Sequence, residues 1–136
     1  MDKVFVCYAS EDTEMVRKIV VGLREEMNMD VWFGPDKLSS VESQFEQVRD
    51  AIKQSSVFMF CASLATDKRN PKSFLAIETQ EALQMLKGDQ PFRAISIRLH
   101  ERARVPEELS GPAVANFALN DWHVQLLKLG SSIRGK

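Results

Sequence analysis

Short, uninterrupted apolar runs constrain the fold of this chain more than any other feature of its sequence. Residues 4–8 and 57–61 contain only aliphatic, aromatic, methionine and cysteine residues. A further short strand is predicted at residues 30–33, from Asp30 to Phe33, and is ended by Gly34 and Pro35. Runs of this length without polar alternation are typical of strands buried on both faces, as in a parallel sheet. The sequence therefore predicts central strands that are covered by helices on both sides.

Helical patterns alternate with these runs. The predicted helices begin near Ser10, at the S-x-x-E capping box of Ser39 and Glu42, at Ser73 and at Asp121. Weaker strand patterns occupy residues 92–99 and 116–119, and residues 34–40 are predicted to form a loop. Strands that alternate with helices favour an α/β fold. Because crossover connections are right-handed, we expect a doubly wound, five-stranded parallel sheet with helices on both faces.

Length and charge bound the organisation of the chain. Its 136 residues suit one domain, predicted over residues 1–130, with residues 131–136 as a frayed tail or the start of a linker. The formal net charge of -1 gives no indication of nucleic-acid or membrane-surface binding. No apolar run is long enough to span a bilayer, and no signal peptide is visible. Cys7 and Cys61 lie in strand patterns and are interpreted as buried free thiols, which favours a reducing, cytoplasmic location.

Candidate site residues are those that leave the carboxyl ends of the predicted strands, where open α/β sheets bind ligands. They are Tyr8, Ala9 and Ser10 after the first strand, and Phe33, Asp36 and Lys37 after the second. The helix that begins at Ser73 faces the same edge. On it, Phe74 and Glu78 are four residues apart and share one face. This pattern indicates an acid beside an aromatic wall at a cleft, or else an exposed acid favoured by the helix dipole.

The assembled motifs resemble the TIR domain of Toll-like and interleukin-1 receptors, plant immune receptors and many bacterial proteins. Residues 3–12 are similar to the opening box of that family, with Cys7 where serine is usual. Residues 30–33, followed by Asp36-Lys37-Leu38, are similar to its second strand and BB loop. Residues 73–79, with Ala82 and Leu83, are similar to its glutamate-bearing helix, and Phe74 stands where tryptophan is usual. The resemblance extends from Lys3 to about Leu129 and implies a flavodoxin-like sheet.

The resemblance also implies an activity, because many TIR domains, bacterial ones among them, cleave NAD between nicotinamide and ribose. Glu78 matches their catalytic glutamate and would act as a single ionised carboxylate. Nicotinamide leaves as a neutral molecule, so no general acid is needed, while a carboxylate stabilises the oxocarbenium-like ribose. The residues implied to border the substrate are Tyr8, Ala9, Ser10, Phe33, Asp36, Lys37 and Phe74. NAD would be substrate, with no cofactor and no metal.

The resemblance further implies self-association through the loop at residues 34–40, in a signalling or immune-defence role. One alternative is a non-catalytic TIR domain that only binds other TIR domains. Another is a response-regulator receiver, which needs a phosphoacceptor aspartate after its third strand, where this chain has Cys61-Ala62-Ser63. Neither GxGxxG nor a P-loop is present. His100 and His123 form no metal or triad pattern and are interpreted as surface or helix-end residues.

Overall fold

The structure is a computed structural model that describes residues 2–37, 44–68, 74–109 and 111–135. Five parallel strands form one sheet in the order β2-β1-β3-β4-β5. The strands are β1 (Lys3–Cys7), β2 (Asp30–Trp32), β3 (Val57–Ala62), β4 (Arg93–Arg98) and β5 (Ala115–Asn116). The helices are α1 (Thr13–Val21), α2 (Gly34–Lys37), α3 (Gln44–Gln54), α4 (Phe74–Lys87) and α5 (Trp122–Arg134). The predicted doubly wound, five-stranded α/β fold is thus confirmed.

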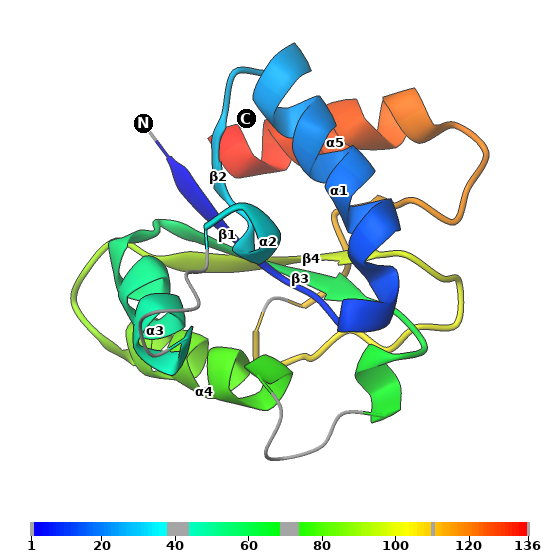
Figure 1. Cartoon of the computed structure of the whole chain (residues 1–136). Coiled ribbons are helices and arrows are strands. Elements are labelled where there is room, and N and C mark those ends of the chain that lie inside the picture. The colour runs from blue at the N-terminus through cyan, green and yellow to red at the C-terminus, as the bar shows by residue number, and fades with distance from the viewer. Residues whose placement is uncertain (1, 38–43, 69–73, 110, 136) are drawn as a thin grey trace.

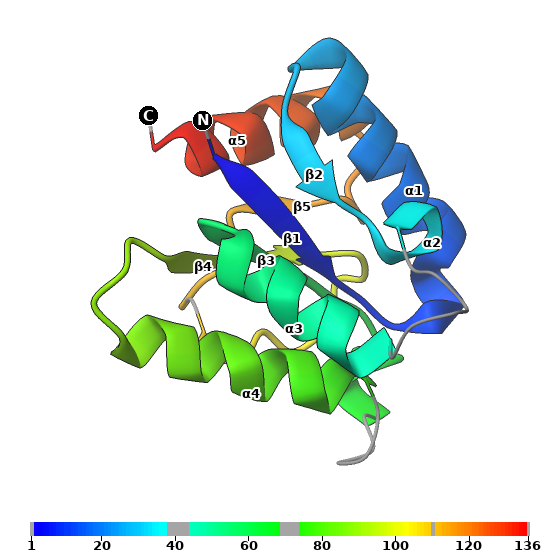
Figure 2. The ribbon, with the colours of Figure 1, turned by 60° about the vertical axis from the view of Figure 1, so that its left-hand side comes forward.

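Helices cover both faces of the sheet, as Figures 1 and 2 show: α1 and α5 lie on one side, and α3 and α4 on the other. Because side chains alternate along a strand, each strand feeds both layers. Val4 and Val6 enter the cluster under α1 and α5, whereas Phe5 and Cys7 enter the cluster under α3 and α4. Burial on both faces is the reason that β1 and β3 appear in the sequence as continuous apolar runs.

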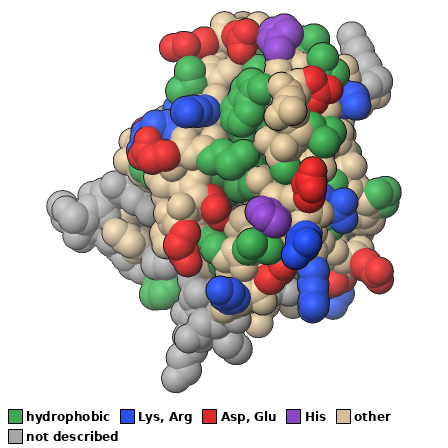
Figure 3. All heavy atoms as spheres, turned by 90° about the vertical axis from the view of Figure 1, so that its right-hand side faces the viewer, with side chains coloured by type: hydrophobic (Ala, Val, Ile, Leu, Met, Phe, Trp, Pro, Cys, Tyr) green, Lys and Arg blue, Asp and Glu red, His purple; other side chains and the backbone are tan. Residues whose placement is uncertain are grey.

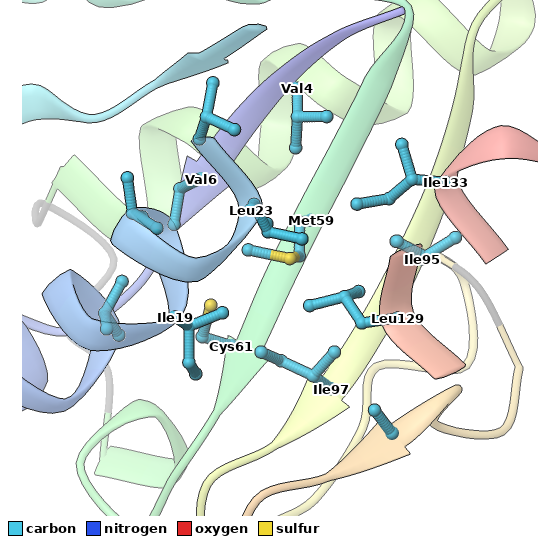
Figure 4. Close-up of a cluster of buried hydrophobic side chains, with 14 of the residues drawn as sticks. Val4, Val6, Ile19, Leu23, Met59, Cys61, Ile95, Ile97, Leu129 and Ile133 are labelled. Carbon is cyan, nitrogen blue, oxygen red and sulfur yellow. The ribbon is translucent and has the colours of Figure 1, made fainter. Parts of the chain in front are cut away.

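The first of these clusters fills the space between the sheet and the α1–α5 layer (Figure 4). Ile19 and Leu23 approach from the first helical segment, Leu129 and Ile133 from α5, and Met59 from the central strand β3. The two helical segments come so close at Gly22 that a methyl group there would lie 2.7 Å from Leu126 Cδ2. A methyl group at this crossing would therefore require the Leu126 side chain to shift.

The first helix is less regular than the sequence predicted. A 3-10 turn at Ser10–Asp12 precedes α1, and a π-helical segment, Gly22–Glu26, follows it. Asn28 then adopts a left-handed conformation with φ 53. Asparagine tolerates this region better than most residues, and the reversal directs the chain into β2. The amide of Met29 donates to the carbonyl of Leu23 at 3.1 Å and fixes the turn.

Two predicted boundaries are corrected, at residues 34–37 and at the last strand. Residues 34–37 form the helical turn α2 and not an open loop. The capping box at Ser39 and Glu42 and the cap at Ser73 lie outside the described residues. Strand β5 is the two residues Ala115–Asn116, earlier and shorter than predicted, because pairing with β4 is confined to Ile97 and Arg98. Helix α4 ends at Lys87, directly before Gly88.

The predicted frayed tail is wrong. Helix α5 continues to Arg134, and Gly135 ends it with φ 75, in the left-handed region that favours glycine. Ile133 is 1% exposed and belongs to the core, and its carbonyl accepts a hydrogen bond from the Arg93 guanidinium. Arg134 Nη2 donates to the carbonyl of Met27 at 2.8 Å. The apolar spacing that ends at Leu129 in the sequence therefore continues one further turn, to Ile133.

All five strands run in the same direction, so their carboxyl ends meet at one edge of the sheet. In Figure 1 the arrowheads of β3 and β4 point toward this edge, and Figure 3 looks onto that side of the molecule. Hydrophobic side chains form a strip down the middle of this face, with charged side chains of both signs around it. This is the edge at which a doubly wound sheet is expected to bind a ligand.

Candidate active site

Glu78 is a buried carboxyl group at the carboxyl edge of the sheet. It lies in the second turn of α4, on the face that packs against β1, and its residue is 9% exposed. Among the residues that the structure describes, no other acidic or basic residue is classed as buried. Of the two interpretations that the sequence left open for Glu78, its burial excludes the exposed acid on an open helix surface.

Cys7 is the partner of that carboxyl. It is the last residue of β1 and is 0% exposed, and its thiol and the Glu78 carboxyl influence each other's pKa. The alternation along β1 directs Cys7 toward α4, and the register places it beside Phe60 of β3. Both cysteines are buried free thiols, as predicted. The contact with Glu78 had not been predicted, although the position of Cys7 at the strand end was a signal for it.

Burial sets the ionisation of this pair. Removal from water raises the pKa of Glu78 to about 8, and the thiol hydrogen bond opposes that rise. Burial, then the Glu78 charge, raises the pKa of Cys7 well above its ordinary value. The expectation that Glu78 is ionised in the free domain is therefore corrected. In the second turn the dipole effect is weak, and desolvation exceeds it.

Tyr8 directly follows Cys7 at the carboxyl end of β1 and is half-buried. Its half-buried ring is 5.5 Å from the ring of Phe33, at an angle of 33°. Burial raises the pKa of the Tyr8 hydroxyl, with a smaller contribution from the charge of Glu78 and an opposing one from a hydrogen bond with Thr13. The charge of Glu78 thus acts on Tyr8, although Tyr8 packs against the cluster under α1 and α5, and Cys7 lies in the cluster under α3 and α4.

Ala9 and Ser10 leave the end of β1 at the surface. Ala9 is half-buried and Ser10 is exposed. The hydroxyl of Ser10 donates to Glu11 Oε1 at 3.1 Å, and its carbonyl accepts from Thr13 Oγ1 at 2.7 Å. The second of these bonds fixes the turn that begins α1.

The two described residues that were predicted to form the site after β2 differ in their exposure. Phe33 is 0% exposed and belongs to the core under α1, where Arg17 lies 5.2 Å from the centre of its ring. The ring of Phe33 packs against the ring of Tyr8 and is not exposed to solvent. The strand that ends just before Phe33 directs its side chain into the core. Asp36 is partly exposed and forms ion pairs with Arg24 at 2.6 Å and Arg17 at 3.7 Å.

Two predicted positions are described only by their backbone. Lys37 is the last residue of α2, and Phe74 is the first residue of α4, four positions before Glu78. Their side chains lie outside the described part of the structure. Trp32 is half-buried and stacks on Phe5, with ring centroids 5.0 Å apart.

A second polar contact at the edge was not predicted. Ser63, directly after β3, donates its hydroxyl proton to Asp12 Oδ2 at 2.5 Å. Thr66 Oγ1 in turn accepts from the Ser63 amide at 2.9 Å. The loops that follow β1 and β3 are thereby joined, which holds Tyr8 and the start of α1 in place. Residues so far apart in sequence carry no local signal for such a contact.

Other kinds of site receive no support from the described residues. Within residues 2–37, 44–68, 74–109 and 111–135, no group of three or more His, Cys, Asp or Glu could hold a metal ion. His100 and His123 are exposed, as predicted. In the same part of the chain, no helix is both long and apolar enough to cross a membrane.

Comparison with models of known protein families shows to which family the chain belongs. A family model described as TIR domain matches residues 4–129, nearly the whole chain. The chain belongs to the TIR domain family. The match includes β1 with Cys7, the α2 turn and the Glu78 helix, so the resemblance inferred from the motifs is confirmed at the level of the family.

Solved structures agree on the fold of this TIR domain. The TIR domain of the Toll-related receptor TRR-2 from the lower metazoan Hydra magnipapillata superposes with a TM-score of 0.72 at 23% identity. That alignment covers 98% of this chain and 99% of the other. A prokaryotic SEFIR domain gives a TM-score of 0.65 at 18% identity, over 98% of this chain and 92% of the other. Identities this low show a shared fold only. No curated protein matches the sequence.

Proposed function

We propose that this TIR domain is an NAD+ nucleosidase that cleaves the bond between nicotinamide and ribose, with Glu78 as its catalytic residue. The supporting observation is the burial of Glu78, whose pKa is raised to about 8. A carboxyl group held out of water, without a cationic partner among the described residues, destabilises the fold and is typical of functional sites. Cytoplasmic signalling or immune defence is the role we infer.

The chemistry suits one carboxyl with a raised pKa. The pyridinium of NAD+ is a cation, and a cation placed beside Glu78 favours the ionised carboxylate. The C–N bond then breaks with its electron pair on the nicotinamide nitrogen, which leaves as a neutral molecule. Positive charge develops on the ribose carbon, and the Glu78 carboxylate stabilises it. Water adds to that carbon and releases a proton, giving ADP-ribose, or a nucleophile of the same substrate closes a ring.

Tyr8, Ala9 and Ser10 are proposed to border the substrate at the end of β1. Asp36, Lys37 and Phe74 stay predictions from the resemblance, whereas Phe33 is 0% exposed and is not proposed to touch the substrate. Of these, Asp36 is partly exposed beside Arg24, so it is accessible to a ligand or to another domain. We further propose that activity requires self-association through residues 34–40, of which the described part is the α2 turn.

The test is direct. The purified domain is clustered on a multivalent support, and loss of NAD+ is followed by chromatography. We expect nicotinamide release by the wild type and a loss of at least a hundredfold in Glu78→Ala and Glu78→Gln, because each removes the carboxylate. Glu81→Gln, on the next turn of the same helix, is the matched control and should retain activity. Release that continues unchanged in both Glu78 variants would overturn the assignment.

A non-catalytic TIR scaffold that mediates TIR–TIR interactions is the second candidate. The outer surface of α5 favours it, because Val124 and Leu127 are 45% and 50% exposed beside a groove that Val114 and Lys128 also line. Exposed apolar side chains next to a groove are typical of interaction surfaces. A clustered domain that releases no nicotinamide at any pH between 6 and 9 would favour this scaffold function.

A further inference from the structure

We propose that Arg98 binds a phosphate group at the carboxyl end of β4, on the side of the sheet that carries the Glu78 helix. That this phosphate belongs to the dinucleotide substrate rests on the proposed NAD+ cleavage, whereas the anion site itself does not. The observation that carries the proposal is the Nε atom of Arg98, which is buried and has no hydrogen-bond partner. A buried donor without an acceptor is rare in proteins, because it loses its hydrogen bonds to water and gains none.

The place of Arg98 in the sheet is fixed by its neighbours. It is the last residue of β4 and pairs in register with Ala62 of β3 and Asn116 of β5. The residues before and after it, Ile97 and Leu99, belong to the cluster under α1 and α5. Because side chains alternate along a strand, the Arg98 side chain lies on the opposite side, which α3 and α4 cover (Figure 2).

The neighbouring side chains leave this guanidinium without an acceptor. Ala62 has no polar side-chain atom, and Asn116 Oδ1 accepts a hydrogen bond from the amide of Ala118 at 2.9 Å. Within the part of the chain that the structure describes, Arg98 forms no ion pair. A buried carboxyl can become neutral by taking up a proton, but an arginine keeps its charge. The partly buried cation therefore favours a bound anion.

The shape of the guanidinium and the charges around it favour a phosphate. Nε and one Nη present two parallel N–H donors, which match two oxygens of a phosphate. Residues 66–68 and 98–104 carry four basic and two acidic residues, so this region is positive in a chain whose net charge is -1. The amide of Arg104 donates to Asp67 Oδ1 at 3.1 Å and joins the two segments. Lys and Arg side chains also gather in the lower part of the face that Figure 3 shows. A positive surface attracts a phosphate-bearing ligand.

The separation of Arg98 from the Glu78 site suits a dinucleotide. Helix α4 contacts both β1 and β4, so the two residues share the side of the sheet that this helix covers. Arg98 lies two strands away from Cys7, at the end of β1, and two residues further along the strand direction. With ordinary strand spacing and rise, their Cα atoms are about 12 Å apart. The pyrophosphate of NAD+ is one ribose away from the bond that is cleaved, and a long arginine side chain covers much of the remaining distance.

The experiment measures binding of inorganic pyrophosphate and of ADP-ribose to the wild type, Arg98→Met, Arg98→Lys and Lys87→Gln by calorimetry. Lys87 is the matched control for charge, because it is exposed at the end of α4, away from the carboxyl edge. We expect Arg98→Met to bind both ligands about tenfold more weakly or worse. Arg98→Lys should lie between, since it keeps the charge without the fork, and Lys87→Gln should bind like the wild type. The NMR signal of the Arg98 Nε–H group, identified by its absence from Arg98→Met, should shift when pyrophosphate binds.

Thermal unfolding separates a binding role of Arg98 from a structural one. Without ligand, Arg98→Met should have a Tm no lower than that of the wild type, because it removes a partly buried charge that has no partner. Pyrophosphate should raise the Tm of the wild type and leave that of Arg98→Met unchanged. A lower Tm of the unliganded variant would show that the guanidinium stabilises the fold, and would overturn the inference.

Equal affinity of the wild type and Arg98→Met for pyrophosphate, or no binding by the wild type, would also overturn it. Binding of pyrophosphate without binding of ADP-ribose would overturn the assignment of the phosphate to a dinucleotide. In NAD+ cleavage we expect the KM of Arg98→Met to rise about tenfold with little change in kcat, as for a residue that only binds substrate. If the wild type cleaves no NAD+, the proposed function fails, but pyrophosphate binding still decides whether Arg98 holds an anion.

Discussion

Arg24 Nη1 donates a hydrogen bond to Asp36 Oδ2 at 2.6 Å and joins the helical segment before β2 to the helical turn after it. The same guanidinium donates through Nη2 to the carbonyl of Val31 at 2.7 Å. A single side chain thus holds β2 and α2 together. Since α2 is the described part of the proposed assembly segment, this contact fixes the surface that a second domain would meet.

Arg24→Ala should destabilise the domain more than Asp36→Ala. The ion pair is partly exposed, which limits its contribution to about 0.5–1 kcal/mol, and Arg24→Ala also removes the bond to Val31, for a total of about 1–2 kcal/mol. Urea unfolding of both variants and of the double variant measures the difference. A coupling energy near zero in that cycle would show that the pair adds nothing to stability.

Substitutions on α2 should weaken self-association. Pro35 is exposed on this turn, so Pro35→Glu adds a charge to the proposed interface without entering the core. Pro112→Glu is the matched control, because Pro112 is also exposed and lies in the segment between β4 and β5. Light scattering against protein concentration measures assembly. Wild-type assembly by Pro35→Glu would show that α2 is not the interface.

Gly22→Ala should destabilise the domain by about 1–2 kcal/mol. The added methyl group would lie 2.7 Å from Leu126 Cδ2, and Leu126 is 1% exposed, so its displacement disturbs the core. The better helix propensity of alanine offsets only part of this loss. Gly88→Ala is the control and should stay within about 0.5 kcal/mol, because its methyl group has no contact closer than 3.5 Å. Thermal and urea unfolding measure both, and equal effects would contradict the proposed crowding.

Glu78 should make the domain less stable as pH rises. Its pKa in the folded protein is about 8, against an ordinary value of 4.5, so the folded state holds a proton that the unfolded state has lost between these values. The contribution of Glu78 is fully present below about pH 4.5 and is lost as pH rises through 8, by on the order of 3–5 kcal/mol. Glu78→Gln should remove this dependence and be the more stable protein at pH 8.

Urea unfolding from pH 5 to pH 9 measures this difference, with Glu81→Gln as the control for the same change on the same helix. The difference in unfolding free energy between Glu78→Gln and the wild type should widen with pH. A difference that is constant across this range would show that Glu78 titrates normally in the folded domain.

The fold class was predicted mainly from the continuous apolar runs of β1 and β3. A strand that is buried on both faces is apolar at every position, and this pattern can be recognised without knowledge of distant contacts. The helices α4 and α5 were predicted from spacing and from Gly88 and Asp121. The end of α5 was misplaced, since Ile133 belongs to the core only through its packing beneath the sheet. The 3-10 and π segments around α1 leave no periodic signal, so a single regular helix was predicted there.

The sequence by itself determined the order of strands and helices, the edge at which a site is expected, and the position of Glu78 on the helix α4. Its motifs also indicated the TIR family, which the comparison with residues 4–129 confirms. Only the tertiary structure decided the state of Glu78, because its burial depends on β1 and on the neighbouring chain segments, far away in sequence. Burial and the Cys7 thiol together set the pKa of Glu78. Neither effect can be inferred from the pattern of residues along α4 alone.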